Sequence, residues 1–423
     1  MIDIITRKKP FLTNTFKLVA GAGIGQAISL AIAPLLTRIY SPAEFGLYTF
    51  FISIAGGFGL VATLRYEMAI ILQKRSDEGI NMASISMTIT FLISCILLAG
   101  IALLSLFYPE FAGEGELRQM IYLLPLLVLL IGAGNIFQHW FNRQGKYSIL
   151  ATGKVINSLG NNGGMLVLGV LGMGVWGLVD GFIFGSGLFV LFFLLIFIYY
   201  DHHVLKDIRL FSFPILLRRH RDLPLANSPQ VVLEMLQNYG IIYLAKIFFD
   251  ASVVGWYALS MRIMQAPLLL IGSSISQVLY KDAAEQYKVT GQIRDMVWKT
   301  LKIAMLVGLP FLLVLLVAGP WLFALVFGDA WKESGIYVQI LAPWMFFDFI
   351  RYTIAQIPLI VKRTKTMFYI SIVGNVLMVF SMCAGGLYFH NVMTGFILLS
   401  ASMSIYAIGV IVWILSITKP TRS

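Results

Sequence analysis

The feature that most constrains this chain is a series of apolar runs, each about 20 residues long, that recur from one end to the other. A run of this length forms a helix that crosses the roughly 30 Å hydrocarbon core of a bilayer. A membrane β-barrel would instead show strands of about 10 residues with alternating hydrophobicity, which this sequence lacks. We therefore predict an all-α membrane protein with about 12 transmembrane helices.

The composition agrees with this prediction, because 59% of the residues are apolar and 12% are charged, and the mean hydropathy is +0.85. Soluble domains have roughly 45–50% apolar and about 25% charged residues. No gap between the runs is long enough for a soluble domain. The predicted helices span residues 13–37, 44–72, 80–107, 118–141, 153–173, 177–200, 226–249, 252–280, 297–326, 335–361, 366–389 and 392–417.

The Lys and Arg residues predict the orientation. Most of the 31 lie in the gaps on one side of the predicted helices, whereas the other side receives Arg38, Arg118, Lys246 and Lys332. Cytoplasmic loops of membrane proteins carry the excess of Lys and Arg. Both termini are therefore predicted to be cytoplasmic. The net charge of +11 reflects this topology rather than binding of nucleic acid.

The two halves of the chain are related in sequence. Residues 36–40 and 46–48 (LTRIY, GLY) match residues 244–248 and 255–257 (LAKIF, GWY). Because six helices separate the copies, the copies have the same orientation, an arrangement known in transporters with a site between the halves. We predict two parallel, pseudo-symmetric six-helix bundles, residues 1–205 and 226–423, joined by a basic cytoplasmic linker at 206–225.

Several ionisable residues fall inside the predicted helices rather than in loops. Such groups cost from roughly 2.5 kcal/mol upward at the bilayer centre, and they usually face a cavity, the bundle interior or an opposite charge. Purely structural explanations are also open for some of these residues. Asp348 and Arg351, three residues apart, would neutralise each other, Arg262 would pair with Glu234 on another helix, and Arg65 and Glu67 would snorkel to the surface. The residues concerned are Arg65, Arg262, Arg351, Asp180, Glu234 and Asp348.

Two further patterns concern helix contacts. Gln230, Glu234 and Asn238 recur every four residues and form either a cavity wall or an interhelical hydrogen-bonding face. Glycines at positions 21 and 25, and at 177, 181 and 185, have the spacing that permits close helix packing in membranes. We favour close packing over a hinge for these glycines.

Signatures of catalysis are missing from the sequence. There is no Gly-rich phosphate loop ending in Lys-Ser/Thr, no metal-ligand spacing among the His and Cys residues, and no recognisable nucleophile constellation. We therefore expect neither a metal nor another cofactor. Parallel halves with buried arginines and no enzyme signature indicate a carrier of an anion, and arginine suits phosphate because its planar fork donates two parallel hydrogen bonds.

The motifs resemble those of a known family. Residues 34–48 (PLLTRIYSPAEFGLY) and 62–70 (ATLRYEMAI) resemble the opening of bacterial oligosaccharide flippases of the Wzx-like O-antigen type, in the multidrug/oligosaccharidyl-lipid/polysaccharide (MOP) exporter superfamily. Residues 140–146 (WFNRQGK), 327–331 (FGDAW) and 342–344 (APW) are more loosely similar to the same family.

This resemblance implies a multi-pass protein of the bacterial inner membrane. Its substrate would be an undecaprenyl-pyrophosphate-linked oligosaccharide, moved by alternating access with H⁺ or Na⁺ coupling. Membrane lipids, and a polysaccharide polymerase with its chain-length regulator, are the implied partners. In this interpretation the pyrophosphate binds in a central cavity to Arg65, Arg262 and Arg351, and near the exit to Arg38 and Lys246. Charge compensation or ion coupling is assigned to Glu234, Asp348, Asp180 and Glu67. The sugars contact Asn157, Asn161, Gln237 and Asn238.

Three alternatives remain open. A cation-coupled multidrug exporter of the same superfamily should have a cavity richer in acidic and aromatic residues. A membrane glycosyltransferase or O-antigen polymerase should have a long external loop, whereas the longest external gap here runs only from Phe107 to Arg118. An accessory subunit without transport activity would have no need of buried arginines.

Overall fold

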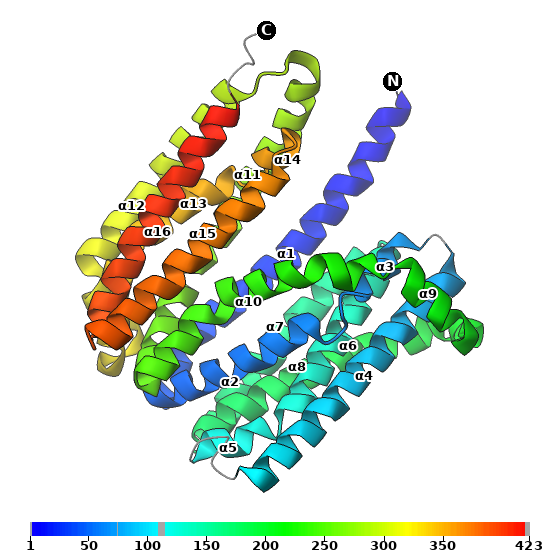
Figure 1. Cartoon of the computed structure of the whole chain (residues 1–423), viewed down its shortest axis with the longest axis horizontal. Coiled ribbons are helices and arrows are strands. Elements are labelled where there is room, and N and C mark those ends of the chain that lie inside the picture. The colour runs from blue at the N-terminus through cyan, green and yellow to red at the C-terminus, as the bar shows by residue number, and fades with distance from the viewer. Residues whose placement is uncertain (1, 74, 109–114, 419–423) are drawn as a thin grey trace. The chain divides into compact units, whose positions relative to one another are not determined.

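The computed structural model describes residues 2–73, 75–108 and 115–418, and these are helical with no strand among them. The described residues include twelve helices of 20 residues or more, which correspond to the predicted spans. They can be followed by their labels in Figure 1. The all-α prediction is confirmed. The long helices are α1 (Ile2–Ile39), α2 (Pro42–Val61), α4 (Ser76–Phe107), α6 (Leu124–Arg143), α7 (Tyr147–Val170), α8 (Val175–Asp201), α10 (Asp222–Phe248), α11 (Ala251–Thr290), α12 (Arg294–Phe327), α13 (Lys332–Thr353), α15 (Thr364–Cys383) and α16 (Val392–Ile417).

Some predicted helices are interrupted. The span predicted at 44–72 divides into α2 and α3 (Glu67–Leu72), and the span at 335–361 divides into α13 and α14 (Ile357–Ile360). A short α5 (Glu116–Ile121) precedes α6, and α15 ends in a π-helical turn, η4 (Ala384–Tyr388). Pro125 and Pro358 lie in the first turns of α6 and α14, where the missing N–H of proline carries no penalty and a new helix starts easily.

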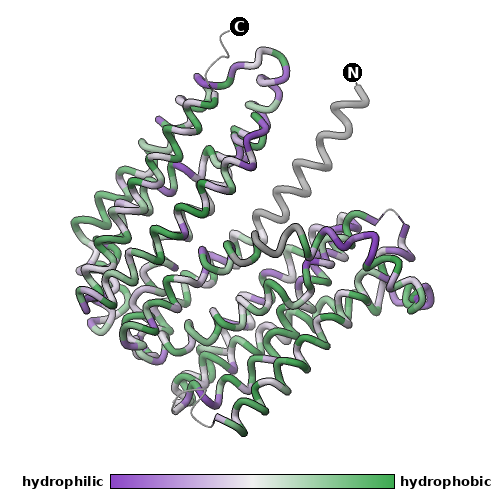
Figure 2. Tube along the Cα trace, viewed as in Figure 1, coloured by the Kyte–Doolittle hydropathy of each residue, from purple (hydrophilic) through white to green (hydrophobic). Residues whose placement is uncertain are grey.

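Eight of the described helices are by themselves long and apolar enough to cross a membrane, and α11 qualifies as a bent pair. Among the long helices whose side chains are described throughout, α7 and α13 do not qualify. In the hydropathy colouring of Figure 2, α4, α8, α12 and α16 are largely hydrophobic. The chain is a multi-pass membrane protein in which α7 and α13 are too polar to face lipid on all sides.

The chain divides into two compact units. Unit 1 contains the residues up to Tyr40 and Leu47–Tyr239, and unit 2 contains Ser41–Gly46 and the residues from Gly240 onward. The division falls inside α10, within the range 226–249 that the sequence predicted to open the second bundle. Residues 41–46 belong to unit 2 because a Cβ on Gly46 would lie 1.8 Å from the carbonyl oxygen of Ala251, so that the two backbones touch.

Each unit surrounds one of the polar helices. In unit 1, α7 packs against α1 and α8; in unit 2, α13 packs against α11, α12 and α16. These neighbours shield the polar side chains of α7 and α13 from lipid, which membrane helices with ionisable groups require.

The predicted linker at 206–225 is structured and belongs to unit 1. It forms the 3₁₀ turns η1 (His202–Asp207) and η2 (Leu210–Ser212), the helix α9 (Phe213–Arg219) and the start of α10. Leu216 and Val204 are buried in the same apolar cluster as Trp140 and Phe193. The segment is therefore part of the bundle end rather than a free tether.

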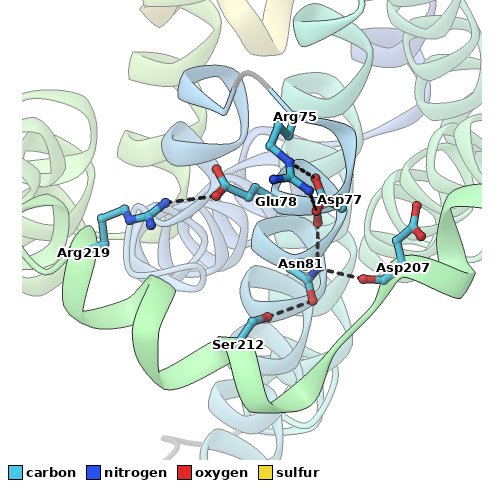
Figure 3. Close-up of polar contacts among 7 residues, drawn as sticks. All are labelled: Arg75, Asp77, Glu78, Asn81, Asp207, Ser212 and Arg219. Carbon is cyan, nitrogen blue, oxygen red and sulfur yellow. Dashed lines mark hydrogen bonds and ion pairs between the residues drawn. The ribbon is translucent and has the colours of Figure 1, made fainter.

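Figure 3 shows the polar contacts that fix this segment to α4. The buried side chain of Asn81 donates to the carbonyl oxygens of Asp77 and Asp207, and its Oδ1 accepts from the backbone N–H of Arg209 and the hydroxyl of Ser212. Arg219 and Glu78 form an ion pair with an N–O distance of 3.2 Å. One buried amide thus satisfies backbone groups on both sides of the junction.

His220 follows α9 and contacts Gln73, whose carbonyl oxygen accepts from the guanidinium of Arg143. Burial, and then the charge of Arg219, lower the pKa of His220 below its ordinary value, while Glu78 acts in the opposite direction. The imidazole is therefore neutral at pH 7, which suits its place in a polar junction beside the cationic Arg219.

Candidate functional site

Arg65 lies in the break between α2 and α3 and forms an ion pair with Glu234 of α10, both within unit 1. Its Nη2 donates to Oε2 of Glu234. The Nε of Arg65 is buried and has no hydrogen-bond partner among the described residues. The two residues are separated by 169 positions in the sequence, so local spacing does not predict their pair.

The backbone at this break is in an unusual conformation. Leu64 and Arg65 have φ angles of 49° and 62°, in the left-handed region that costs side-chain-bearing residues roughly 1–2 kcal/mol each. Turn hydrogen bonds from Leu64 to Val61 and from Tyr66 to Thr63 hold the segment. Such strain is concentrated at ligand-binding and switching sites, so the geometry favours a functional role for the break.

Glu67 stands two residues beyond Arg65 and is almost fully buried. Its carboxylate accepts a hydrogen bond from the hydroxyl of Thr63, across the break. The snorkelling alternative considered for Glu67 is therefore wrong, because the side chain turns into the protein and not toward a surface.

Unit 2 contains a second arginine–carboxylate pair. On α13, Nε of Arg351 donates to Oδ1 of Asp348 at 2.8 Å, and Nη2 lies 2.6 Å from the same oxygen. The pair anticipated from the spacing of three residues is present. About a fifth of the Arg351 side chain and three tenths of the Asp348 side chain are exposed, so both groups can be reached from outside unit 2.

A polar groove of about 290 Å³ runs between α1 and α7 within unit 1. Nδ2 of Asn161 donates to Oδ1 of Asn157 at 2.8 Å, and Oδ1 of Asn162 accepts from the hydroxyl of Ser29 at 3.4 Å. The two predicted sugar-contacting residues of α7 therefore lie together in a hollow. The side chains that line it are Gln26, Ser29, Lys154, Asn157, Ser158, Asn161 and Asn162, with Ala22 and Gly25.

Glycines bring the helices around this groove close together. A Cβ on Gly25 would lie 3.4 Å from the carbonyl oxygen of Lys154, and a Cβ on Gly185 would lie 2.0 Å from Oδ1 of Asn161. A Cβ on Gly181 would similarly lie 2.3 Å from the backbone N of Met165. The predicted role of these glycines in close helix contact is confirmed.

Sequence reasoning missed Lys154, Gln26 and Asn162. Lys154 lies near the start of the helix predicted at 153–173, and in the structure it is part of α7 and lines the groove. The sequence does contain a pattern that predicts this face, since Lys154, Asn157 and Asn161 are spaced by three and four residues and must share one side of a helix.

The other predicted site residues are more dispersed. Arg38 is exposed in the last turn of α1, and Lys246 is half-buried in the last turn of α10. Arg262 on α11 and Asp180 on α8 are half-buried. Gln237 and Asn238 are exposed on the part of α10 that belongs to unit 1. No cluster of three or more His, Cys, Asp or Glu side chains that could hold a metal occurs in the described residues.

The fold is that of known transporters. The structure is similar to that of the lipid II flippase MurJ in an inward closed conformation, with a TM-score of 0.68 and 15% identity over 96% of this chain and 90% of the other. It is also similar to an inward-facing multidrug resistance MATE family transporter of the MOP superfamily, with a TM-score of 0.60 and 15% identity over 96% of both chains. A MOP superfamily transporter from Pyrococcus furiosus aligns over 96% of each chain with a TM-score of 0.53 and 15% identity.

The sequence comparisons identify one family. No curated protein matches the chain in sequence. The family described as "Polysaccharide biosynthesis protein" matches residues 35–336, well over half of the chain, and this range contains the break at Arg65, the α7 face of the groove and Glu234. The chain therefore belongs to the polysaccharide biosynthesis protein family.

Proposed function

We propose that this protein is a flippase that moves undecaprenyl-pyrophosphate-linked oligosaccharide, an O-antigen or related repeat unit, from the cytoplasmic to the periplasmic leaflet. It works by alternating access and is coupled to an H⁺ or Na⁺ gradient. The family supports a role in polysaccharide biosynthesis, and the similarity to a lipid II flippase supports the fold that such a role needs.

The observation that carries the proposal is the strained break at Arg65 with its carboxylate partner Glu234. A guanidinium donates two parallel hydrogen bonds to a phosphate as it does to a carboxylate. In the substrate-free protein Glu234 occupies the place that a phosphate oxygen takes when the lipid binds. The buried, unpartnered Nε of Arg65 supplies a further donor for the pyrophosphate.

The remaining predicted residues take their roles from this mechanism. Arg262 and Arg351 join Arg65 on the pyrophosphate, and Arg38 and Lys246 receive it near the exit. Asp348 compensates Arg351, and Glu67 and Asp180 are further candidates for ion coupling. Asn157, Asn161, Gln237 and Asn238 contact sugars. The lipid tail stays in the bilayer, so the bundles move around a bound headgroup.

The cellular setting follows from the charge distribution. The excess of Lys and Arg in the gaps on one side supports cytoplasmic termini in the bacterial inner membrane. The two six-helix bundles at 1–205 and 226–423 act as the moving bodies, and the segment 206–225 stays on the cytoplasmic side. A negative-inside potential favours export of the anion by roughly 2.3 kcal/mol per charge per 100 mV. A polymerase and its chain-length regulator take up the product.

The test is flipping of an undecaprenyl-pyrophosphate oligosaccharide in proteoliposomes, comparing wild type with Arg65→Ala and Arg65→Lys. We expect Ala to abolish transport and Lys to restore only part of it, because ammonium lacks the planar fork. Arg363→Ala is the matched control, since Arg363 is exposed between α14 and α15 and should leave the rate unchanged.

Other outcomes identify the alternatives. Wild-type transport that is insensitive to Arg65 would leave a flippase with a different pyrophosphate site. Export of cationic dyes without any lipid movement would establish a multidrug exporter. Elongation of the lipid-linked glycan, rather than its translocation, would establish a membrane glycosyltransferase or polymerase.

A further inference from the structure

The groove between α1 and α7 combines several amides with one positive charge. We propose that it binds a sugar that carries a carboxylate, with Lys154 as its counter-charge, so that the protein prefers acidic repeat units. The inference rests on the proposed flippase function, because it concerns which oligosaccharides that function serves.

Among the described side chains that line the groove, Lys154 is the only ionisable one. Helix α7 contains no Asp or Glu, and neither does the whole stretch 117–179 around it. Within the described part of the chain the Lys154 ammonium takes part in no ion pair and no side-chain hydrogen bond. The protein itself therefore supplies no counter-charge to this groove from its described side chains.

The position of Lys154 makes an unpaired charge expensive. It stands seven residues into α7, which corresponds to roughly 10 Å along the helix axis. Cations at such positions are usually paired with an anion or open to a water-filled cavity that an ion or substrate enters. Lys154 faces a groove, so the anion that completes its surroundings arrives with the ligand.

The rest of the groove suits a sugar. The side-chain amide of Gln26 and the Nδ2 of Asn157 make no hydrogen bond to another described residue, so both are open to a ligand. Amides both donate and accept, which matches sugar hydroxyls. The Nδ2 of Asn161 donates to Asn157, and Ser29, Ser158 and Asn162 are hydrogen-bonded to one another or to the backbone. These bonds hold the wall of the groove in place.

Charge balance favours a carboxylate over pyrophosphate. A pyrophosphate diester carries about two negative charges and is matched best by guanidinium forks, whereas the groove offers one ammonium and no arginine. A single carboxylate neutralises a single lysine. Uronic acids and related acidic sugars combine that carboxylate with the hydroxyls that the amides bind.

The experiment compares two undecaprenyl-pyrophosphate lipids in proteoliposomes that differ at one sugar, a glucuronic acid in one and a glucose in the other. We expect wild type to flip the acidic lipid about tenfold faster, the effect of one charge-assisted hydrogen bond. Lys154→Gln should remove this preference by lowering the rate of the acidic lipid toward that of the neutral one. Lys154→Arg should keep the preference.

Two more variants complete the design. Asn157→Asp keeps the acceptor for Asn161 but places a carboxylate three residues from Lys154 on the same helix face, so it should also abolish the preference for the acidic lipid. Lys288→Gln removes an exposed lysine from the last turn of α11 and should behave like wild type. Thermal unfolding of each purified variant shows that it is folded.

The outcomes separate the two proposals. If Lys154→Gln slows both lipids equally, Lys154 serves the shared pyrophosphate or the fold, and the inference is overturned. An acidic preference that survives in both Lys154→Gln and Asn157→Asp overturns it as well. If wild type moves neither lipid, the flippase function itself fails.

Discussion

Arg65 illustrates how a single residue combines strain, charge and burial. It holds a left-handed backbone conformation, pairs with Glu234 and leaves Nε buried without a partner among the described residues. The first and third of these features cost free energy. Their occurrence together at Arg65 is what we expect of a site where a carboxylate and a phosphate ligand replace each other.

Replacing Glu234 by Gln removes the competing charge while keeping the shape of the side chain. We expect Glu234→Gln to bind a pyrophosphate-linked lipid several-fold more tightly and to flip it more slowly, because Arg65 is released in the resting state and no carboxylate returns to displace the product. Binding is measured by titration in detergent and transport in proteoliposomes. An unchanged dissociation constant would show that Glu234 does not compete with the ligand.

Leu64 allows the strain itself to be tested. Leu64→Gly removes a left-handed penalty of roughly 1–2 kcal/mol at an exposed side chain, offset by about 1 kcal/mol of unfolded-state entropy. The melting temperature should stay constant or rise slightly. Met68→Gly is the control, since Met68 is similarly exposed but helical, and it should lower the melting temperature. Equal losses in both variants would contradict the strain argument.

At the scale of the elements, the polar helices α7 and α13 depend on their neighbours. Helix α7 brings its amides into the membrane only because α1 and α8 cover it, and α8 approaches through glycines. At Gly185 a methyl group would lie 2.0 Å from Oδ1 and 2.1 Å from the backbone N of Asn161. The groove wall and the helix contact are therefore coupled through one position.

We expect Gly185→Ala to destabilise the protein by about 1–3 kcal/mol, as overpacking does in well-packed interiors. Gly187→Ala, two residues further along the same helix, meets nothing within 4 Å and should be neutral or slightly stabilising because alanine favours the helix. Thermal unfolding in detergent compares the two. If Gly187→Ala proved the more harmful, close packing of α7 on α8 would not be the reason for Gly185.

The junction at Asn81 gives a second test at this scale. Asn81→Ala leaves backbone groups of Asp207 and Arg209 without their partner, and each lost hydrogen bond costs about 1 kcal/mol. We expect amide hydrogen exchange in residues 202–219 to accelerate by about tenfold or more, measured by mass spectrometry. Thr88→Ala, which loses only a bond to its own helix, should leave this exchange unchanged; acceleration there too would point to loosening of α4 as a whole.

At the scale of the whole molecule, the orientation in the membrane follows from charge and is directly testable. In a background with Cys95 and Cys383 replaced by Ala, a membrane-impermeant maleimide added to intact spheroplasts should label Met173→Cys, between α7 and α8, and not Arg209→Cys. Both positions lie outside the long helices. Labelling with the opposite preference would reverse the predicted topology.

Much of this protein is determined by its sequence alone. Helix number and type follow from the length of the apolar runs, because any spanning backbone must satisfy its own hydrogen bonds in lipid. The predicted range 392–417 coincides with α16, and the spacing of Asp348 and Arg351 predicted their pair. These are local properties, set by neighbours within a few residues.

Only the tertiary structure decided how distant residues meet. The pairing of Arg65 with Glu234, the break in the predicted helix at 44–72 and the docking of residues 202–219 on α4 all depend on contacts between segments far apart in sequence. Lys154 is the one charged side chain among the described residues that line a groove, because α1 packs beside α7 through glycines. An apolar pattern favours insertion of a helix into the membrane, but packing between helices decides which of its faces lines a cavity.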